Sequence, residues 1–450
     1  MTKFSVRVDA AQKIRPIGKL SGTNNGPIHT FTDRTKEYRE MGVDFVRFHE
    51  THSFNTKCVE VPFIFRDFSA DENDPANYYF AETDAVIRGA VDAGIEIMYR
   101  LGMGTEGSLP RIFCVAPLDF EKWARVAEHI IMHYNEGWAN GFHYNIEYWE
   151  VWNEPDLFTY WYNPAWKDDE VRPKFVEFYC TVSQYLKKKF PRLKFGAAGF
   201  ATCRPGAPKA DATPEQKWNW QDRMKMYDLL GEATESGKAA ADFFCFHSYH
   251  RDIRAIRFKL ERVQSLLSDF HLENMELINT EWGAIGLQRD KNGIWYYDQM
   301  YTAHSAVDTL ATMLVYQKAG VTKAAYYDAD ERSKFCGLYE FGGGYKNHAY
   351  AFLAFKALKE AGTEVVCEGF EGPETSAVAA VGDGKLVVVF ANDGEEKKAT
   401  LHLENLPECD YAAEKLDTKL SPAGKGRFTG RALSVDLPRD TAKIITFHLK

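Results

Sequence analysis

The sequence lacks the features that mark membrane-bound, secreted or nucleic-acid-binding proteins. No stretch approaches the roughly 18 consecutive apolar residues of a membrane span. The opening residues MTKFSVRVDAAQKIRPIG alternate and carry charge, without a signal-peptide core. The net charge is −9, from 55 basic and 64 acidic residues, and no basic cluster suits a phosphate backbone. If the chain is untrimmed, we expect a soluble, cytoplasmic protein with no membrane or nucleic-acid partner; whether it forms a homo-oligomer stays open.

Paired cysteines are also missing. The eight cysteines occur singly, and no two have CxxC spacing. In a long chain this scatter predicts reduced core residues in place of disulfides, and it argues against a structural zinc site. They are Cys58, Cys114, Cys180, Cys203, Cys245, Cys336, Cys367 and Cys409.

No GxGxxG turn follows the first apolar run, so nothing supports a doubly wound nucleotide-binding sheet. The sequence does contain eight short apolar or aromatic runs that alternate with longer amphipathic segments. Eight strands, each followed by a helix, predict an α/β fold of the (β/α)8 TIM barrel type. The expected strands lie at 19–26, 43–50, 94–104, 146–155, 193–200, 241–250, 275–283 and 323–330.

The amphipathic segments predict the helices of this barrel. Their apolar residues recur at i, i+3 and i+4, and several segments end at a glycine before the next strand, as at Gly42, Gly94 and Gly320. The clearest expected helices lie at 34–42, 82–94, 119–137, 174–190 and 349–362.

The pattern changes after residue 362. Short alternating strands and the hairpin signals GDGK (382–385) and NDGE (392–395) predict a C-terminal antiparallel β-sandwich over residues 363–450. The barrel is expected over residues 19–362. Residues 1–18 are expected to form an N-terminal strand that pairs with the sandwich.

Functional side chains of such barrels gather where the strands end. Two carboxylates occupy these positions, Glu154 after the fourth strand and Glu281 after the seventh, and aromatic residues surround both. This arrangement suits the hydrolysis of glycosidic bonds. One carboxyl group protonates the leaving oxygen while the second attacks the anomeric carbon or activates water, and no metal or other cofactor is required.

Simpler explanations apply to each residue taken alone. A single glutamate at a strand end is usually solvated or part of an ion pair. His49 and His247 suit hydrogen-bonded core positions equally well, and the aromatic run 158–166 suits loop packing. Two such glutamates on different strands, each beside a tryptophan, favour function over these alternatives.

Several motifs resemble a known enzyme family. YWEVWNEPDL (148–157) resembles the acid/base motif at strand four of clan A glycoside hydrolases, and INTEWG (278–283) resembles their nucleophile motif at strand seven. VRFHE (46–50), HSYH (247–250) and YYDAD (326–330) are most similar to glycoside hydrolase family 39, the family of β-xylosidases and α-L-iduronidases. The resemblance covers nearly the whole chain and implies a retaining glycosidase with a barrel and a β-sandwich.

The resemblance also implies roles for individual residues. Glu154 corresponds to the general acid/base and Glu281 to the nucleophile. Asn153 corresponds to the asparagine that hydrogen-bonds the sugar 2-hydroxyl, and Tyr249 to the tyrosine that holds the nucleophile. We expect further substrate contacts from His49, His247, Trp161, Trp282 and Tyr327, and we expect Arg47 near the nucleophile.

A second glutamate, Glu150, lies in the same strand as Glu154. On an extended strand residues 150, 152 and 154 share one face, which places Glu154 at the barrel mouth and Glu150 roughly 6–7 Å deeper. A buried unpaired charge is costly. We therefore expect Glu150 to pair with Arg47 and to support the site without performing the chemistry.

The sequence departs from the family pattern where the sugar is selected. Tyr327 occupies the place of a strand-eight tryptophan, and the roles of Asp328, Asp330 and Glu331 stay open. Our first hypothesis is an exo-acting, β-xylosidase-like retaining hydrolase of a small oligosaccharide or glycoside. Retention predicts carboxyl groups about 5–5.5 Å apart, and inversion predicts about 6.5 Å or more.

Two further hypotheses stay open. The second keeps the reaction but changes the sugar, as in an α-L-arabinosidase, a β-galactosidase or a uronic-acid hydrolase. A uronic-acid hydrolase needs cations near the sugar, for which His49, Arg100 and Arg204 are candidates. The third is a catalytically silent carbohydrate-binding protein on a hydrolase scaffold.

Overall fold

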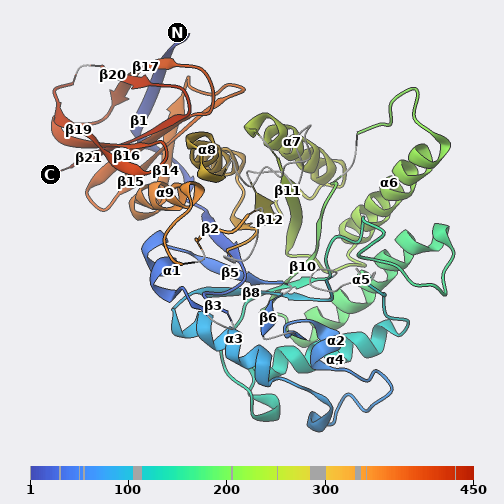
Figure 1. Cartoon of the computed structure of the whole chain (residues 1–450). Coiled ribbons are helices and arrows are strands. Elements are labelled where there is room, and N and C mark those ends of the chain that lie inside the picture. The colour runs from blue at the N-terminus through green and yellow to red at the C-terminus, as the bar shows by residue number, and fades with distance from the viewer. Residues whose placement is uncertain are drawn as a thin grey trace.

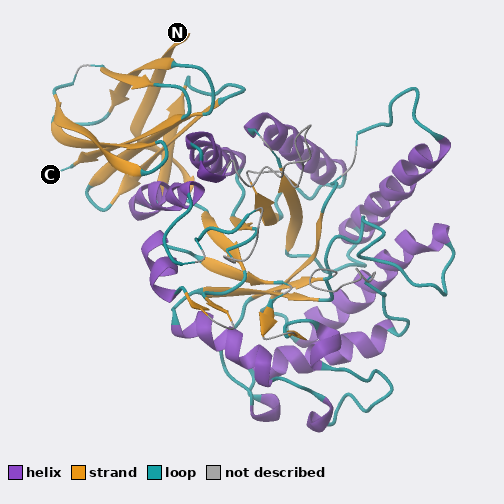
Figure 2. Cartoon of the chain, viewed as in Figure 1, coloured by secondary structure: helices purple, strands orange, loops and turns teal. Residues whose placement is uncertain are grey.

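A computed structural model shows a barrel packed against a separate β-sheet domain (Figure 1). Helices surround the barrel, whereas the second domain consists of strands (Figure 2). The structure describes residues 2–29, 32–49, 51–53, 56–104, 114–203, 206–250, 252–283, 300–329, 336–340, 342–430 and 432–449.

Eight parallel strands close into a barrel in which sequence neighbours are also neighbours in space. The predicted (β/α)8 barrel and all eight of its strands are confirmed. The strands are β2 (Lys19–Asn24), β5 (Phe45–Phe48), β8 (Glu96–Leu101), β9 (Tyr148–Val151), β10 (Lys194–Phe200), β11 (Phe243–Tyr249), β12 (Glu276–Gly283) and β13 (Lys323–Tyr326).

Helices follow the strands at the predicted places, and the helices at 34–42, 82–94, 119–137, 174–190 and 349–362 are confirmed. The main helices are α1 (Thr35–Met41), α3 (Ala81–Asp92), α4 (Phe120–Asn135), α5 (Val171–Lys189), α6 (Pro214–Glu235), α7 (Ile253–Asp269), α8 (Ala303–Ala319) and α9 (Tyr350–Ala361). Short elements lie in the loops: β3 (Ile28–His29), β4 (Thr32–Asp33), β6 (His52–Ser53), β7 (Thr56–Lys57), α2 (Val61–Ile64), and the 3₁₀ turns η1 (Pro75–Asn77), η2 (Trp138–Asn140), η3 (Asp168–Glu170) and η5 (Asn347–Ala349).

The barrel interior changes from apolar to polar along the strands. Phe45, Met98 and Tyr148 lie in a small buried apolar cluster inside the barrel. Side chains two residues further along a strand point to the same face, so Arg47 and Glu150 form the next layer, and both are fully buried. This alternation places a charged layer directly beneath the mouth of the barrel.

The second domain is one nine-stranded sheet in the order β19-β18-β21-β16-β15-β14-β1-β17-β20. Its own buried core includes Val8, Val365, Val388 and Phe447. The first strand of the chain, β1, pairs antiparallel with β14 and parallel with β17. The strands are β1 (Thr2–Pro16), β14 (Thr363–Glu368), β15 (Thr375–Gly382), β16 (Lys385–Asn392), β17 (Lys397–Glu404), β18 (Cys409–Leu416), β19 (Leu420–Phe428), β20 (Leu433–Leu437) and β21 (Thr441–His448).

The two hairpin signals have different outcomes. GDGK joins β15 and β16 in a hairpin, and Asp383 (φ 45°) and Gly384 (φ 67°) adopt the left-handed conformation that such a turn requires. NDGE follows β16, but β17 does not pair with β16. The prediction of a hairpin at residues 392–395 is wrong, because β1 takes the place beside β17.

Helices α8 and α9 lie between the barrel and the nine-stranded sheet (Figure 1). All eight cysteines are free thiols, as predicted, and all except Cys180 are buried. Within the described part of the chain, no helix combines the length and the apolar character needed to cross a bilayer.

Candidate active site

The backbone leaves its extended conformation just after β9. Trp152 (φ 74°) and Glu154 (φ 43°) both adopt left-handed conformations, which are uncommon for residues other than glycine. The ring of Trp152 therefore packs outside the barrel, against Trp123 of α4 and Phe178 of α5. The expectation that residue 152 shares the inner face with Glu150 and Glu154 is wrong, because the strand geometry ends at Val151.

Arg47 connects the polar residues of the barrel interior. Its guanidinium group donates to Glu150 Oε2 (2.6 Å), Glu281 Oε1 (2.8 Å), Asn153 Oδ1 (2.8 Å) and Asn24 Oδ1 (3.0 Å). Burial alone would lower the pKa of Arg47, but the charges of Glu150 and Glu281 outweigh burial and raise the pKa above its ordinary value. Arg47 is therefore a permanent cation at the centre of the site.

Glu150 has the buried ion pair expected from the sequence. Besides Arg47, its carboxylate accepts hydrogen bonds on Oε1 from the Gly199 backbone N–H (2.9 Å) and the Thr280 hydroxyl (2.9 Å). Three donors on a fully buried carboxylate compensate the cost of desolvating the charge. The predicted pairing of Glu150 with Arg47 is confirmed.

Glu281 is surrounded by hydrogen-bond donors. Tyr249 donates its hydroxyl to Oε2 (2.7 Å), as predicted, and Arg47 donates to Oε1. Burial first, and then the charge of Glu281, raise the pKa of Tyr249 well above its ordinary value, so the hydroxyl keeps its proton. His49 Nε2 lies 3.2 Å from Oε1.

The protonation of His49 follows from its second contact. Arg100 Nε donates to His49 Nδ1 at 2.9 Å. Because a guanidinium group cannot accept a hydrogen bond, Nδ1 must be the acceptor, and the imidazole proton resides on Nε2, facing Glu281. Glu281 thus accepts from a guanidinium, a phenol and an imidazole, which is an environment for an ionised carboxylate.

Glu154 has a different neighbour. Its Oε1 lies 2.8 Å from His247 Nδ1, and His247 Nε2 lies 3.1 Å from the Thr280 hydroxyl oxygen. Burial, followed by the charges of Arg47 and Lys259, lowers the pKa of His247 well below its ordinary value. His247 is therefore neutral, and Glu154 faces an uncharged imidazole.

The two candidate carboxylates approach each other across the barrel. One ligand atom each of Glu154, His247 and Glu281 lies within 4.8 Å of the other two. An approach this close between one oxygen of each carboxylate is compatible with the short carboxyl separation of retaining glycosidases. The same three residues could hold a metal ion. A second such group of described residues is found where α8 meets the sheet, and consists of His304, Asp393 and Asp440.

Two residues that the sequence interpretation missed connect these groups. Thr280 is an extra residue in β12, because Phe246 pairs with Asn279 and His247 pairs with Glu281. Such a β-bulge turns consecutive residues to one side, so both Thr280 and Glu281 reach the barrel interior. The second is Gly199 of β10. Its backbone lies so close to His247 that a Cβ atom at residue 199 would come within 1.9 Å of His247 Nε2.

Asn153 and Tyr327 lie beside the carboxylates. Asn153 is fully buried, and its Nδ2 has no hydrogen-bond partner among the described residues. The Tyr327 ring lies 6.2 Å from the ring of Tyr249 and 6.4 Å from that of His49, the two residues that contact Glu281. Asp328 is buried next to Tyr327 and accepts from Cys336 Sγ at 3.5 Å.

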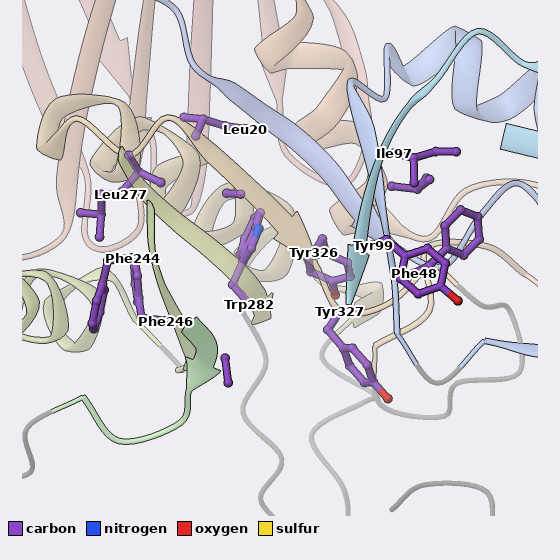
Figure 3. Packing of buried hydrophobic residues seen from close by; sticks show 14 of the residues in the cluster. Leu20, Phe48, Ile97, Tyr99, Phe244, Phe246, Leu277, Trp282, Tyr326 and Tyr327 are labelled. Carbon is purple, nitrogen blue, oxygen red and sulfur yellow. The ribbon is translucent and has the colours of Figure 1, made fainter. Parts of the chain in front are cut away.

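The structure does not bring Trp161 and Trp282 to the carboxylates. Trp282 packs in edge-to-face contact with Tyr316 of α8 and with Tyr326, while the Tyr327 side chain points away from this pair (Figure 3). Trp161 is fully buried beside Trp152 and donates to the Val171 carbonyl at 2.9 Å. Both rings are buried in aromatic packing. Arg204, Asp330 and Glu331 lie outside the described residues.

Comparison with known proteins agrees with this geometry. The sequence model described as "Glycosyl hydrolases family 39" matches residues 4–282, a range that contains both Glu154 and Glu281. No curated protein matches the sequence.

Solved structures share the fold over the full chain. They include a glucosidase from Croceicoccus marinus (17% identity, TM-score 0.74, covering 100% of this chain and 99% of that one). A monomeric β-xylosidase from Caulobacter crescentus CB15 has 15% identity and a TM-score of 0.69, with 100% of both chains covered. A GH39 enzyme from Xanthomonas axonopodis pv. citri has 15% identity and a TM-score of 0.66, covering 99% of this chain and 97% of that one.

Proposed function

Because this chain belongs to family 39 of the glycosyl hydrolases, we propose that it is an exo-acting, β-xylosidase-like enzyme with Glu281 as nucleophile and Glu154 as general acid/base. Enzymes of this family hydrolyse O-glycosyl bonds with retention, so the type of reaction follows from membership. The sugar, the exo action and the roles of individual residues are the proposal.

The unequal environments of the two glutamates support this assignment. Glu281 accepts from Arg47, His49 and Tyr249, and these contacts favour its ionised form, which a nucleophile requires. Glu154 faces the neutral His247 and is partly desolvated, which favours the protonated form that a general acid requires.

The first step forms a glycosyl-enzyme. A carboxylate oxygen of Glu281 attacks the anomeric carbon while Glu154 transfers its proton to the leaving glycosidic oxygen. The leaving group departs as a neutral alcohol, and Glu154 becomes a carboxylate. Arg47 remains paired with Glu150 as the charge of Glu281 is consumed, so the interior keeps a balanced ion pair.

The second step releases the sugar. Glu154, now a carboxylate, takes a proton from a water molecule, and the resulting hydroxide attacks the anomeric carbon. The bond to Glu281 breaks, its carboxylate is regenerated, and Glu154 again carries a proton. Two inversions at the same carbon give net retention.

Asn153, Tyr327 and His49 are proposed to contact the sugar. The buried Nδ2 of Asn153 is a donor without a partner among the described residues, and a sugar hydroxyl beside Glu154 would accept from it. The Tyr327 ring, close to both Tyr249 and His49, offers an aromatic surface near the nucleophile. The substrate is proposed to be a small oligosaccharide or glycoside.

The ion pair of Arg100 with Glu60 argues against a uronic acid, in place of xylose, as the substrate sugar. Arg100 Nη2 donates to Glu60 Oε1 at 2.7 Å, and both side chains are fully buried. The cation is therefore neutralised within the protein and is a weak attraction for a sugar carboxylate.

Turnover of a panel of nitrophenyl glycosides tests the proposal, with Glu281→Ala as the control. We expect release of nitrophenol from the β-D-xyloside, loss of release in Glu281→Ala, and a β-anomer as the first product by NMR. Preference for another sugar would replace the xylose assignment. Turnover that persists in Glu281→Ala would contradict the catalytic assignment.

A further inference from the structure

We propose that Thr280, acting through His247, is a positioning residue that holds the acid proton on Glu154. The inference rests on the proposed function, because it explains how the proposed acid keeps its proton between catalytic cycles. It starts from the chain of contacts Glu150–Thr280–His247–Glu154, in which the three distances are 2.9, 3.1 and 2.8 Å.

The direction of the first hydrogen bond is fixed by charge. A threonine hydroxyl carries one hydrogen, and it can donate this hydrogen either to Glu150 Oε1 or to His247 Nε2. Glu150 is an ionised carboxylate paired with Arg47, and a charged acceptor forms the stronger hydrogen bond. The Thr280 hydrogen therefore points to Glu150, and the Thr280 oxygen turns its lone pairs towards His247.

The direction of the second hydrogen bond follows from the first. The Thr280 oxygen can only accept from His247 Nε2, so Nε2 carries a hydrogen. Burial keeps His247 neutral, and a neutral imidazole carries only one hydrogen. Nδ1 is therefore a bare acceptor.

Because Nδ1 of His247 carries no hydrogen, Glu154 must be protonated. Nδ1 faces Glu154 Oε1 at 2.8 Å, and two acceptors at this distance need a hydrogen between them. Glu154 supplies it when the carboxyl group is protonated. After Glu154 gives up this proton, its oxygen faces a lone pair, and this repulsion favours taking a proton from water in the second step.

Other charged groups also lie near Glu154 and His247. Glu281 Oε2 lies 3.4 Å from His247 Nδ1, beyond the usual hydrogen-bond distance, and it already accepts from the Tyr249 hydroxyl. The anion of Glu281 disfavours a second carboxylate nearby, which also favours protonated Glu154. The cations of Arg47 and Lys259 disfavour a positive charge on His247. Tyr249 is directed to Glu281.

The backbone at Gly199 restricts the positions of the His247 and Thr280 side chains. A Cβ atom at residue 199 would lie 1.9 Å from His247 Nε2 and 2.5 Å from the Thr280 hydroxyl oxygen. The Gly199 N–H also donates to Glu150 Oε1, and the Gly199 carbonyl accepts from the Glu154 N–H at 3.2 Å. Gly199 therefore lies close to all four residues of the series Glu150–Thr280–His247–Glu154.

The test is the pH dependence of kcat/KM for Thr280→Val, with Thr280→Ser as the matched control. Valine removes the hydroxyl and lets His247 carry its hydrogen on Nδ1, where it would stabilise ionised Glu154. We expect the alkaline limb of the profile to move to lower pH by about one unit, the size of one hydrogen bond to a charged group. Serine keeps the hydroxyl and should retain the wild-type limb.

Two outcomes would overturn the inference: an unchanged alkaline limb in Thr280→Val, or equal shifts in the valine and serine variants. Nitrogen NMR of histidine in the wild-type enzyme provides a second test that needs no folded valine variant. The signal lost in His247→Gln should report a hydrogen on Nε2, and a hydrogen on Nδ1 would overturn the inference. A wild-type enzyme that hydrolyses no glycoside would instead contradict the proposed function.

Discussion

At the residue scale, three glutamates in one barrel have three different surroundings. Glu150 is paired with Arg47 and held by Gly199 and Thr280. Glu281 accepts from a cation and two neutral donors, whereas Glu154 faces a neutral imidazole. Since the side chains are identical, only these neighbours can give them different protonation states.

The roles of Glu150 and Glu154 should separate under matched substitution. Glu150→Gln breaks a buried ion pair and should lower the free energy of unfolding by about 3–5 kcal/mol, while leaving measurable turnover. Glu154→Gln should unfold like the wild type but lose about 10²–10⁴-fold in kcat/KM. Denaturant unfolding and glycoside kinetics of both variants check this. Equal losses of activity, with both variants folded, would contradict the separation.

The hydroxyl of Tyr249 should contribute to the reactivity of Glu281 without being essential. Tyr249→Phe removes one hydrogen bond to a carboxylate, which is worth about 1.5–3 kcal/mol, so kcat/KM should fall roughly 10- to 150-fold. Tyr316→Phe is a suitable control, because among the described residues the Tyr316 hydroxyl is hydrogen-bonded to Ser248 and Asn279 and not to a carboxylate. If Tyr249→Phe had no larger effect than Tyr316→Phe, the contact would not serve the nucleophile.

At the scale of elements, β10 and β12 build the site through two departures from regular strand geometry. The bulge at Thr280 brings two consecutive side chains into the barrel, and Gly199 lets His247 approach the backbone of β10. Neither feature supplies chemistry. Both set the distances on which the chemistry depends.

Gly199→Ala adds only one methyl group, but we expect it to disrupt the site. The added methyl group would overlap His247 and Thr280, and overpacking of this kind costs about 1–3 kcal/mol in stability. We expect the folded variant to lose most of its turnover because His247 is displaced from Glu154. Gly342→Ala is the control, since a Cβ atom there meets nothing within 4 Å. Wild-type activity in Gly199→Ala would contradict the close packing.

Strand ends were predictable from the sequence, but strand irregularities were not. The eight apolar runs between amphipathic segments identified the barrel, and the positions of Glu154 and Glu281 at strand ends identified its two candidate carboxylates. The pairing of Glu150 with Arg47 followed from the cost of a buried charge. The left-handed turn at Trp152 and the bulge at Thr280 depend on pairing between strands distant in sequence. For this reason Trp152 was placed on the wrong face, and Thr280 was missed.

At the scale of the whole molecule, polar contacts join the barrel to the nine-stranded sheet through α8. Gln317 Nε2 donates to Glu364 Oε2 at 2.8 Å, and His304 Nδ1 lies 2.6 Å from Asp393 Oδ1. The alternation of residues 363–450 predicted the sheet. The pairing of β17 with β1 could not be derived locally, because it joins the two ends of the chain.

The His304–Asp393 pair should make stability depend on pH. The hydrogen bond to Asp393 raises the pKa of His304 from 6.5 to about 9, so the folded protein holds this proton more tightly than the unfolded chain. The stabilisation is fully present below pH 6.5 and is lost as the pH rises through about 9. The Tm difference between the wild type and His304→Gln should shrink over this range.

Thermal unfolding at several pH values checks this prediction, with His271→Gln as the control because the His271 side chain is 81% exposed. A Tm difference for His304→Gln that stays constant from pH 6.5 to 9 would show that the pair does not couple protonation to stability.

The central claim is that Glu281 forms the covalent intermediate, and mass spectrometry of the trapped enzyme tests it most directly. The probe is the 2-deoxy-2-fluoro derivative, with a good leaving group, of the glycoside that turns over fastest. Fluorine slows both steps, while the leaving group lets the glycosyl-enzyme accumulate. We predict one sugar per chain, attached to the peptide that carries Glu281. A sugar attached to Glu154 or to any other residue would contradict the account.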